Sequence, residues 1–222
     1  RKTERLMTKV LKTLERGLFV GNATTNPLSF NGIEAQMPSS HVYTIDIRTG
    51  RSVVQTLRSI IRKAVSDEEL LRNVTHIFTS GLGSELIERE LDQKLQYRNL
   101  ETIRPGLVVP EILTQAGMIP IVNSPYIRDI DLSSASVDPH DEIVFYIINI
   151  RDLVWNGVVP EGGINSLEPQ MFDVSRYIDG TTPYMLEKRL YLVYGTLYVN
   201  DRGESMYKLI VKVPPGTASG IL

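Results

Sequence analysis

The segment Gly81-Leu82-Gly83-Ser84-Glu85 is the short pattern whose residue types best suggest phosphate chemistry. It precedes a helical pattern, and backbone amides at the start of a helix bind anions. A dinucleotide fingerprint requires a third glycine where Leu86 stands, and a phosphate loop requires a Lys-Ser or Lys-Thr pair after the second glycine. Both are missing. We therefore interpret the segment as a structural turn. A nucleotide-binding α/β enzyme that uses the turn at Gly81 and Gly83 is the less favoured alternative.

Other candidate catalytic and metal-binding residues lack partners at the required spacing. Ser84 has Leu82 and Leu86 where a nucleophile elbow has glycines. The absence of cysteine excludes cysteine-ligated metal sites and fits an intracellular or virion protein. The sequence has three histidines without a shared ligand spacing, which are His41, His76 and His140. We therefore expect no catalytic residues, no cofactor and no metal site, and we do not expect an enzyme.

An acidic stretch that ends near residue 142 is the second candidate site. Calcium prefers several carboxylate and carbonyl oxygens. A twelve-residue calcium loop counted from Asp129 places Ser134 where glycine is expected and His140 where the bidentate glutamate is expected. Residues 123–141 are therefore interpreted as a long, solvated polar loop. Its acidic residues are Asp129, Asp131, Asp138, Asp141 and Glu142.

A basic concentration is the third candidate site, and it consists of Arg48, Arg51, Arg58, Arg62 and Lys63. A solvated helix needs a charged face in any case, so contact with nucleic acid is the less favoured interpretation, and then only as sequence-independent attraction. The whole chain has 24 basic and 26 acidic residues and a formal charge of −2. It lacks the basic excess expected of a dedicated nucleic-acid binder.

Amphipathic helices and strands must position these residues. Apolar residues recur at three- and four-residue spacing over residues 1–18, 53–65 and 82–95, which predicts three helices. Residues 42–47 alternate as a half-buried strand, and residues 74–79 are mostly β-branched or aromatic. Residues 142–150 predict a strand that is buried on both faces. Two helix stripes around one strand indicate a layered α/β nucleus.

The remaining patterns predict less regular structure. Prolines in residues 106–110 and 117–122 favour edge strands or irregular segments, because proline cannot donate to a sheet ladder. Residues 190–199 and 205–213 flank a turn-rich tetrad and predict a two-stranded hairpin. The 222 residues suffice for one large domain or two joined ones. No apolar run approaches the ~20 residues that span a bilayer. The uncapped helical pattern at residue 1 leads us to expect further sequence upstream.

Five segments carry a family resemblance through their order in the chain: residues 15–22, 26–33, 74–80, 117–122 and 187–197. In this order they resemble the end of the spine helix, the following turn, a strand entering the central sheet, a glycine-led apolar strand and a long late strand of tailed-bacteriophage major capsid proteins. The resemblance spans most of residues 5–213. The family's N-terminal arm and extended two-stranded loop have no counterpart in this sequence.

The resemblance implies an α+β fold of the phage major-capsid type. Such a fold has a spine helix, a peripheral domain with long β-strands and an axial domain with a central mixed sheet flanked by helices. Residues 1–41 would form the spine helix and turn of the peripheral domain. Residues 42–171 would form the axial domain, and residues 172–222 the late strands that return to the peripheral domain, followed by a C-terminal tail.

The resemblance also implies a structural role. We expect a viral capsid subunit that self-assembles into hexamers and pentamers of an icosahedral shell around packaged DNA, in a virion assembled in the host cytoplasm. The expected partners are other copies, portal, scaffold or decoration proteins and, at most non-specifically, DNA, without a membrane. Basic residues of a neighbouring copy would meet a contact set that comprises Arg128, Asp129, Asp131, Asp138, Asp141 and Glu142. An encapsulin-like nanocompartment, which shares the fold but holds protein cargo, is the main alternative.

Overall fold

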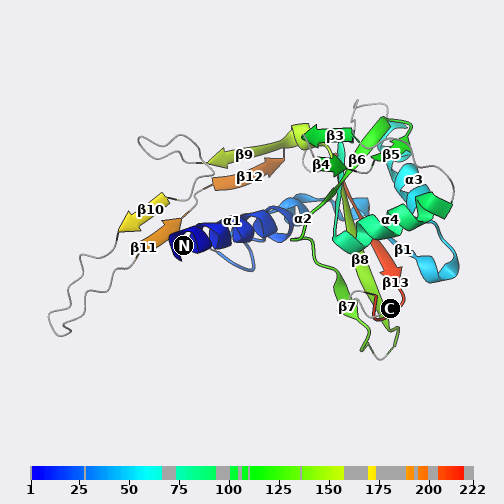
Figure 1. Ribbon diagram of the computed structural model, residues 1–222, viewed down its shortest axis with the longest axis horizontal. Helices are drawn as coiled ribbons and strands as arrows, with labels where there is room; N and C mark the ends of the chain where they lie inside the picture. The colour runs from blue at the N-terminus through cyan, green and yellow to red at the C-terminus, as the bar shows by residue number, and fades with distance from the viewer. Residues whose placement is uncertain are drawn as a thin grey trace. The chain divides into compact units, whose positions relative to one another are not determined.

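The computed structural model describes residues 2–27, 29–66, 74–93, 101–104, 107–109, 111–135, 137–157, 170–173, 189–192, 195–199 and 205–217. Its internal contacts divide the chain into two compact units. Unit 1 comprises Arg1–Ala35 and Val154–Tyr198, and unit 2 comprises Gln36–Leu153 and Val199–Leu222. Figure 1 labels most of the helices and strands of both units.

Unit 2 is built on a seven-stranded mixed sheet in the order β1-β13-β8-β2-β6-β5, with β7 paired to β8 beside this path. Two pairs are parallel, β1 with β13 and β2 with β6, and the other pairs are antiparallel. The strands are β1 (Val42–Asp46), β2 (His76–Thr79), β5 (Glu111–Thr114), β6 (Gly117–Asn123), β7 (Ile130–Leu132), β8 (His140–Ile148) and β13 (Met206–Val213).

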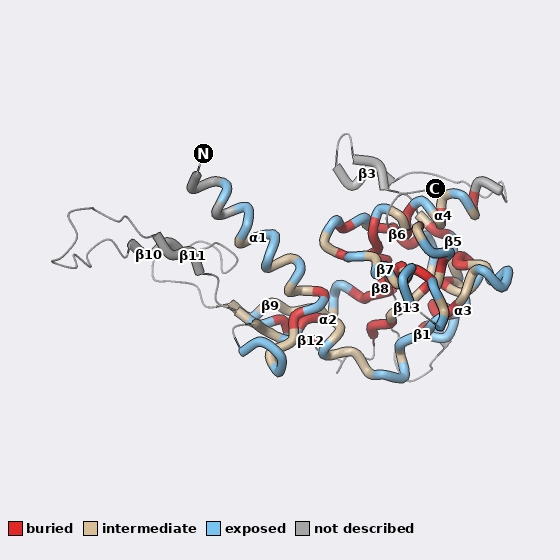
Figure 2. Tube along the Cα trace, turned by 90° about the horizontal axis from the view of Figure 1, so that it is seen from below, coloured by how far each residue is buried: buried red, intermediate tan, exposed pale blue. Residues whose placement is uncertain are grey.

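Strand β8 is the centre of this sheet. It pairs with β13 on one side and with β2 on the other. Every residue from Ile143 to Ile148 is buried, as Figure 2 shows in red. The prediction of a strand buried on both faces is confirmed, because a nearly continuous apolar run can be accommodated only where both faces are covered.

Helices α3 (Val53–Ser66) and α4 (Gly81–Gln93) pack on one face of the sheet. The strand register places Leu209, Phe145 and Ile77 on that face, where they join Leu57 and Ile87 of the helices in one buried cluster. Both helices lie where their apolar spacing predicts them, although residues 94 and 95 of the predicted second helix lie outside the described residues. Among the described helices, none is long and apolar enough to cross a membrane.

The start of α3 is capped by its neighbour α4. The Ser52 hydroxyl accepts a hydrogen bond from the Gln55 amide at 3.1 Å and donates to Oε1 of Glu90. Oε2 of Glu90 accepts a hydrogen bond from the Val54 amide at 3.1 Å. Amides in the first turn of a helix have no partner within the helix, so a carboxylate beside them stabilises the helix start.

Unit 1 contains α1 (Lys2–Val20) and two short ladders. Strand β9 (Leu153–Gly157) pairs with β12 (Gly195–Val199), and β10 (Gln170–Asp173) pairs with β11 (Arg189–Leu192). The remaining elements of the chain are α2 (Ile33–Gln36), which lies at the boundary of the two units, and short elements of unit 2. The latter are the 3₁₀ turns η1 (Ser39–His41), η2 (Ile47–Thr49) and η3 (Ile150–Asp152), and a ladder of β3 (Glu101–Arg104) with β4 (Leu107–Val109).

The end of α1 depends on close backbone approaches that only glycine permits. The Gly21 amide donates to Gly17 O at 2.9 Å, and the Gly32 amide donates to Gly21 O at 2.8 Å. A Cβ atom at either Gly21 or Gly32 would lie 2.4 Å from Gly17 O. The predicted turn after the first helix therefore closes back onto the last turn of that helix.

Three local predictions are wrong. Strand β6 is internal and not an edge strand. Its proline is tolerated because pairing with β2 begins only at Ile121, one residue after Pro120.

The predicted hairpin of residues 190–199 and 205–213 does not form. Strand β12 pairs with β9, while the apolar strand β13 pairs with β8 and β1, so non-local apolar pairing overrides the local turn signal. Residues 123–141 are not one loop, because β7 lies within them.

The compact units differ from the sequence-based domain boundaries. The units divide after residues 35, 153 and 198, whereas the sequence suggested boundaries after residues 41 and 171. Residues 172–222, expected as one group, are shared, because β11 belongs to unit 1 and β13 to unit 2. The assignment of the units to peripheral and axial domains remains a prediction.

Candidate functional site

The acidic stretch folds into a hairpin of β7 and β8. Ile130 pairs with Glu142, and Leu132 pairs with His140. At the turn, the Ala135 amide donates to Leu132 O at 2.9 Å, and Oδ1 of Asp131 accepts hydrogen bonds from the Ser133 amide at 2.9 Å and the Ser133 hydroxyl at 2.6 Å. The Ser133 bonds lower the pKa of Asp131. The predicted contact residues therefore lie along an ordered hairpin.

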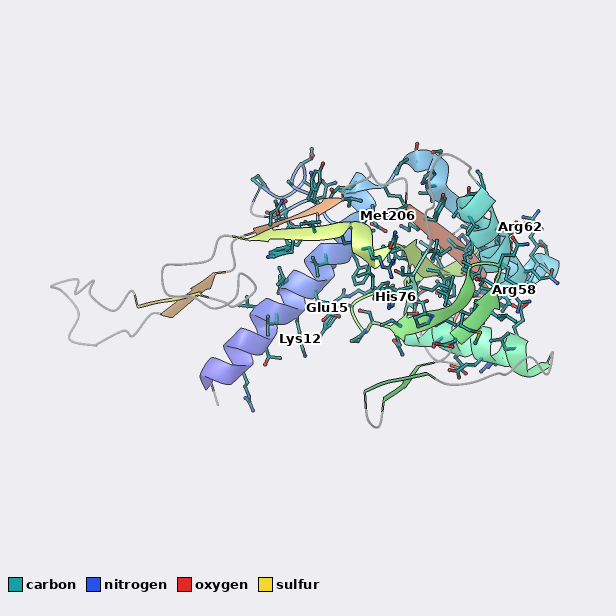
Figure 3. The ribbon with its side chains drawn as sticks, turned by 90° about the horizontal axis from the view of Figure 1, so that it is seen from above. Lys12, Glu15, Arg58, Arg62, His76 and Met206 are labelled. Atoms are coloured by element: carbon teal, nitrogen blue, oxygen red, sulfur yellow. The ribbon has the colours of Figure 1, made fainter. Side chains whose placement is uncertain are left out.

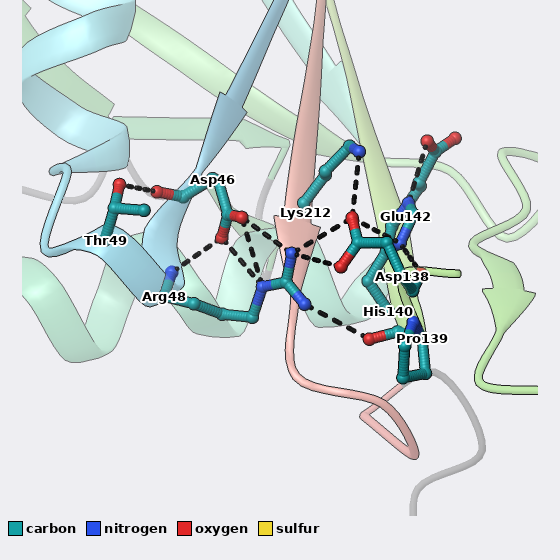
Figure 4. A network of polar contacts seen from close by, with 8 residues as sticks. All are labelled: Asp46, Arg48, Thr49, Asp138, Pro139, His140, Glu142 and Lys212. Carbon is teal, nitrogen blue, oxygen red and sulfur yellow. Dashed lines mark hydrogen bonds and ion pairs between the residues drawn. The ribbon is translucent and has the colours of Figure 1, made fainter. Parts of the chain in front are cut away.

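Arg48 fixes the end of this hairpin to the turn after β1 (Figure 4). Its guanidinium donates from Nη2 to Asp138 Oδ1 at 3.0 Å and from Nη1 to Pro139 O at 3.1 Å. It also donates from Nε to Asp46 Oδ1 at 2.9 Å and from Nη2 to Asp46 Oδ2 at 2.7 Å. Lys212 of β13 approaches Asp138 Oδ2 at 3.4 Å. Asp138, predicted to meet basic residues of a neighbour, thus meets two in its own chain.

The charges of this network stabilise one another. The hydrogen bonds from Arg48 lower the pKa of Asp46 from 3.8 to about 2. Arg48, followed by Lys212, also holds the pKa of Asp138 below its ordinary value. The two carboxylates in turn raise the pKa of Arg48. Because hydrogen bonds that donate to a carboxylate favour its ionised form, both aspartates stay charged down to acidic pH.

His140 lies buried at the start of β8, between two carboxylates of the hairpin. Its Nδ1 is 3.4 Å from Asp138 Oδ2, and its Nε2 is 3.4 Å from Glu142 Oε1. Nδ1 also lies 2.5 Å from Asp138 O. Glu142 and Asp138 of the predicted set are therefore linked through one imidazole ring.

The other predicted contact residues make different contacts. Asp129 accepts a hydrogen bond from the Ser80 hydroxyl at 2.7 Å, and burial, with a smaller contribution from Asp141, raises the pKa of Asp129. Asp141 is fully buried, and Arg128 is exposed. The structure therefore links Asp138 and Glu142 through His140, pairs Asp131 with Asp141 between β7 and β8, and places Arg128 and Asp129 just before β7.

The glycine turn is filled by side chains of its own unit. The Ser80 hydroxyl accepts a hydrogen bond from the Gly83 amide at 3.2 Å, so this helix-start amide is already satisfied. A Cβ atom at Gly83 would lie 1.9 Å from Thr79 Oγ1 and 3.1 Å from the Phe145 ring. A phosphate cradle requires open backbone amides in front of the helix. This geometry favours the structural turn over a nucleotide site.

The predicted basic concentration is divided among different contacts. Arg48 binds the aspartates, and Lys63 donates to the Tyr43 hydroxyl at 2.9 Å. Arg58 Nε donates to Leu113 O of β5 at 3.0 Å. Arg58 and the exposed Arg62, both labelled in Figure 3, line a surface hollow of about 370 Å³ between α3 and the end of β5.

Sequence reasoning missed two features of this region. The β5 side of the hollow, Leu113 and Thr114, lies more than fifty positions from Arg58, and no local pattern signals that proximity. The pairing of Arg48 with Asp138 is equally non-local, at 90 positions. The sequence signal for these contacts is charge alone, since the sequence shows both a basic group and an acidic stretch.

Comparison with known proteins identifies the fold. No family model matches the sequence, and no curated protein sequence does. Among solved structures, the chain is similar to the cryo-EM structure of the holo-SrpI encapsulin complex from Synechococcus elongatus PCC 7942, with a TM-score of 0.61 and 12% sequence identity. The match covers 92% of this chain and 62% of the encapsulin chain, so the chain spans less than two thirds of that protein's length. The predicted α+β fold of the capsid type is confirmed at the level of an encapsulin-like fold.

Proposed function

We propose that the protein is a structural subunit that self-assembles into a closed icosahedral shell of hexamers and pentamers. The observation that carries this proposal is the encapsulin-like fold over 92% of the chain. Packing between copies, and not chemistry on a bound substrate, would then be the mechanism. Contacts between different patches of the same chain generate rings when the rotation closes.

The geometry of unit 2 supports such a role. A shell subunit must present its contact surfaces in fixed positions, because each small misplacement accumulates around a ring. The Arg48 network joins β1, β8, β13 and the hairpin of β7 and β8 through charge-assisted hydrogen bonds. This network holds an otherwise exposed hairpin in one orientation, which supports a role in contacts between copies.

The content of the shell distinguishes two versions of the proposal. The order of the sequence segments favours a phage head with packaged DNA, with portal, scaffold or decoration proteins as further partners and the virion as its location. The structural likeness to an encapsulin favours a compartment that holds protein cargo and is assembled in the cytoplasm. Any contact with DNA would be non-specific in the first version, since the formal charge of the chain is −2.

Assembly and content can be tested by two successive experiments. The purified full-length protein is examined by light scattering coupled to size-exclusion chromatography and by negative-stain electron microscopy, and we expect closed particles or ring-shaped capsomers. A protein that stays monomeric at every concentration would refute the shell proposal. Particles from the native source are then treated with nuclease, because protected DNA supports the phage version, whereas co-purified protein without DNA supports the compartment.

A further inference from the structure

Two exposed patches of unit 2 combine charge with exposed apolar side chains, and their charges are opposite. The acidic knob is the tip of the hairpin of β7 and β8, with Asp131, Val137 and Asp138. The basic hollow is the cavity of about 370 Å³ between α3 and β5, with Arg58, Arg62 and Leu113. Such a pair is complementary in charge and in apolar character, which is the composition of a protein contact surface.

The acidic knob is held by hydrogen bonds of both its strands while its apolar residue faces solvent. Val137 is 94% exposed, and Asp131 is exposed beside its Ser133 partner. The Asp138 side chain remains 47% exposed although Arg48 binds it. The ladder of β7 with β8 and the bonds of Arg48 to Asp138 and Pro139 fix the tip from both sides. Residues whose backbone is already held by such bonds lose less conformational entropy when they dock.

The basic hollow offers two guanidinium groups one helical turn apart and an apolar wall. Arg62 has no hydrogen-bond or ion-pair partner within the described part of the chain. Leu113 is 60% exposed, and Met118, its register partner on β6, is 40% exposed. Of the described residues that line the hollow, none is acidic and none is aromatic. The exposed leucine and the lack of stacking aromatics fit a polypeptide with acidic and apolar side chains better than a nucleic acid.

The knob and the hollow lie at opposite ends of the sheet. Strand β6 begins at Gly117, next to the hollow, and runs parallel to β2. Strand β8 begins at His140, next to the knob, and runs antiparallel to β2, so β6 and β8 start at opposite ends of the sheet. One chain therefore cannot dock its own knob into its own hollow. Two copies can make this contact, which is then heterologous and can close a ring.

We propose that the acidic knob of one copy docks in the basic hollow of the next copy, with Val137 against Leu113 and with the knob carboxylates facing Arg58 and Arg62. This proposal rests on the proposed shell function and identifies the two surfaces that would join neighbouring subunits. All the residues that carry it are at least partly exposed in the single chain, so substitutions there test assembly without disturbing the core.

Two single variants that change the charge on either side of the contact, and their combination, test the contact. Arg62→Glu and Val137→Lys are each expected to raise the protein concentration at which particles form by at least about tenfold, because each places like charges or an uncompensated charge in the contact. The double variant R62E/V137K is expected to recover most of this loss, since the introduced lysine of one copy then faces the introduced glutamate of the next. Arg51→Glu, a reversal of an exposed arginine just before α3 and outside the hollow, is the matched control.

The outcomes separate this contact from the shell proposal. If all four variants form particles like the unmodified protein, the contact is wrong and the shell proposal stands. The same conclusion follows if the single variants fail and the double variant, folded by far-UV circular dichroism, fails as well. An unmodified chain that never assembles refutes both. Impaired assembly in both single variants, together with recovery in the double variant, supports the contact.

Cysteine crosslinking gives a second measurement, because the chain has no cysteine of its own. Ser59 lines the hollow, so chains with Ser59→Cys are mixed with chains with Val137→Cys under assembly conditions and a mild oxidant. We expect a disulfide-linked dimer on a non-reducing gel. The control mixture replaces Ser59→Cys with Arg51→Cys. Equal dimer yields in both mixtures, or none in the first while particles form, would overturn the proposed docking.

Discussion

Arg48 binds Asp138 across 90 positions of sequence, with Nη2 3.0 Å from Oδ1, and thereby ties the turn after β1 to the start of β8. The same guanidinium binds Asp46 two positions away. One arginine thus joins a local turn to a distant hairpin, and the stability of that junction depends on the ionisation of two carboxylates.

The junction is expected to weaken in acid. The folded-state pKa of Asp46 is about 2 against an ordinary value of 3.8, and that of Asp138 is lowered as well. A carboxyl with a lowered folded pKa contributes stability above its unfolded pKa and loses it as pH falls through the folded pKa. Stability should therefore fall between about pH 4 and pH 2. Thermal unfolding of the unmodified protein and of Asp138→Asn across this range checks the prediction.

The Asp138→Asn variant should show a smaller loss of stability on acidification than the unmodified protein, since it has one fewer carboxylate to protonate. Glu85→Gln, which removes a carboxylate outside the Arg48 network, is the control and should follow the unmodified curve. Identical pH dependence in all three proteins would contradict the assignment of the acid transition to this network.

Asp129 should behave in the opposite sense. Burial raises the pKa of this carboxyl, so the folded chain binds its proton more tightly than the unfolded chain. Its contribution to stability therefore increases as pH falls through the raised pKa toward the ordinary value. Asp129→Asn keeps an acceptor for the Ser80 hydroxyl without the charge. Chemical denaturation at pH 7 should show that the variant is at least as stable as the unmodified protein, and a clear destabilisation would contradict this account.

Gly83→Ala is expected to destabilise unit 2 by about 1–3 kcal/mol, the usual range for overpacking a core. The added methyl group would lie 1.9 Å from Thr79 Oγ1 and 3.1 Å from Phe145, both buried. Gly81→Ala, two residues earlier, is the matched control, because its nearest neighbour would be 3.6 Å away, an ordinary contact. Urea unfolding compares the two, and equal midpoints would show that the turn has more room than the structure indicates.

Gly195→Ala is expected to disturb unit 1 at its tryptophan. A Cβ atom there would lie 2.3 Å from Trp155 Cζ2, and the indole also packs edge-on against Phe30 at a centroid distance of 5.2 Å. Trp155 is the single tryptophan of the chain, so its fluorescence reports this unit directly. We expect a shifted emission maximum and a lower unfolding midpoint. Thr196→Ala on the neighbouring exposed position should leave both unchanged, and an unshifted Gly195→Ala spectrum would refute the packing.

Glu90→Ala should cost about 0.5–2 kcal/mol, the range for losing a helix cap. Its carboxylate serves the Val54 amide and the Ser52 hydroxyl at the start of α3. Glu85→Ala, on the same helix, removes only an exposed pair with Arg89 and should change stability by less than about 0.5 kcal/mol. Guanidinium unfolding monitored by circular dichroism measures both, and equal effects would argue against the cap.

Helices and the central strand were predictable because their signals are local. The apolar spacing of α3 and the run from Ile143 to Ile148 specify element type within a short window. Strand β13 shows the limit of local signals. Its residues read as one arm of a hairpin, yet it pairs with β8 and β1 because their apolar faces bury it better than a local turn partner does. The spacing of apolar residues indicates which face of a strand is buried, but it carries no information about which strand pairs with it.

The candidate site was half predictable for the same reason. Composition marked both the acidic stretch and the basic group. The structure folds the first into a hairpin and divides the second among different contacts. Composition did not show that Arg48 would bind Asp138 within one chain, or that Arg58 would reach Leu113, because both contacts depend on strand order. Val137 carried no signal at all, since an isolated valine in a polar stretch gives no pattern.

The position of β13 has a consequence for synthesis. Strand β1 finds its partner in the sheet only in β13, more than 160 residues later, and β13 also completes one side of β8. A nascent chain that has emerged only through Leu153 carries both flanking strands without the strand that belongs between them. Ribosome-bound chains should therefore hold β1 and β8 apart until β13 emerges, so that the sheet of unit 2 is completed only after residue 213 has left the ribosome.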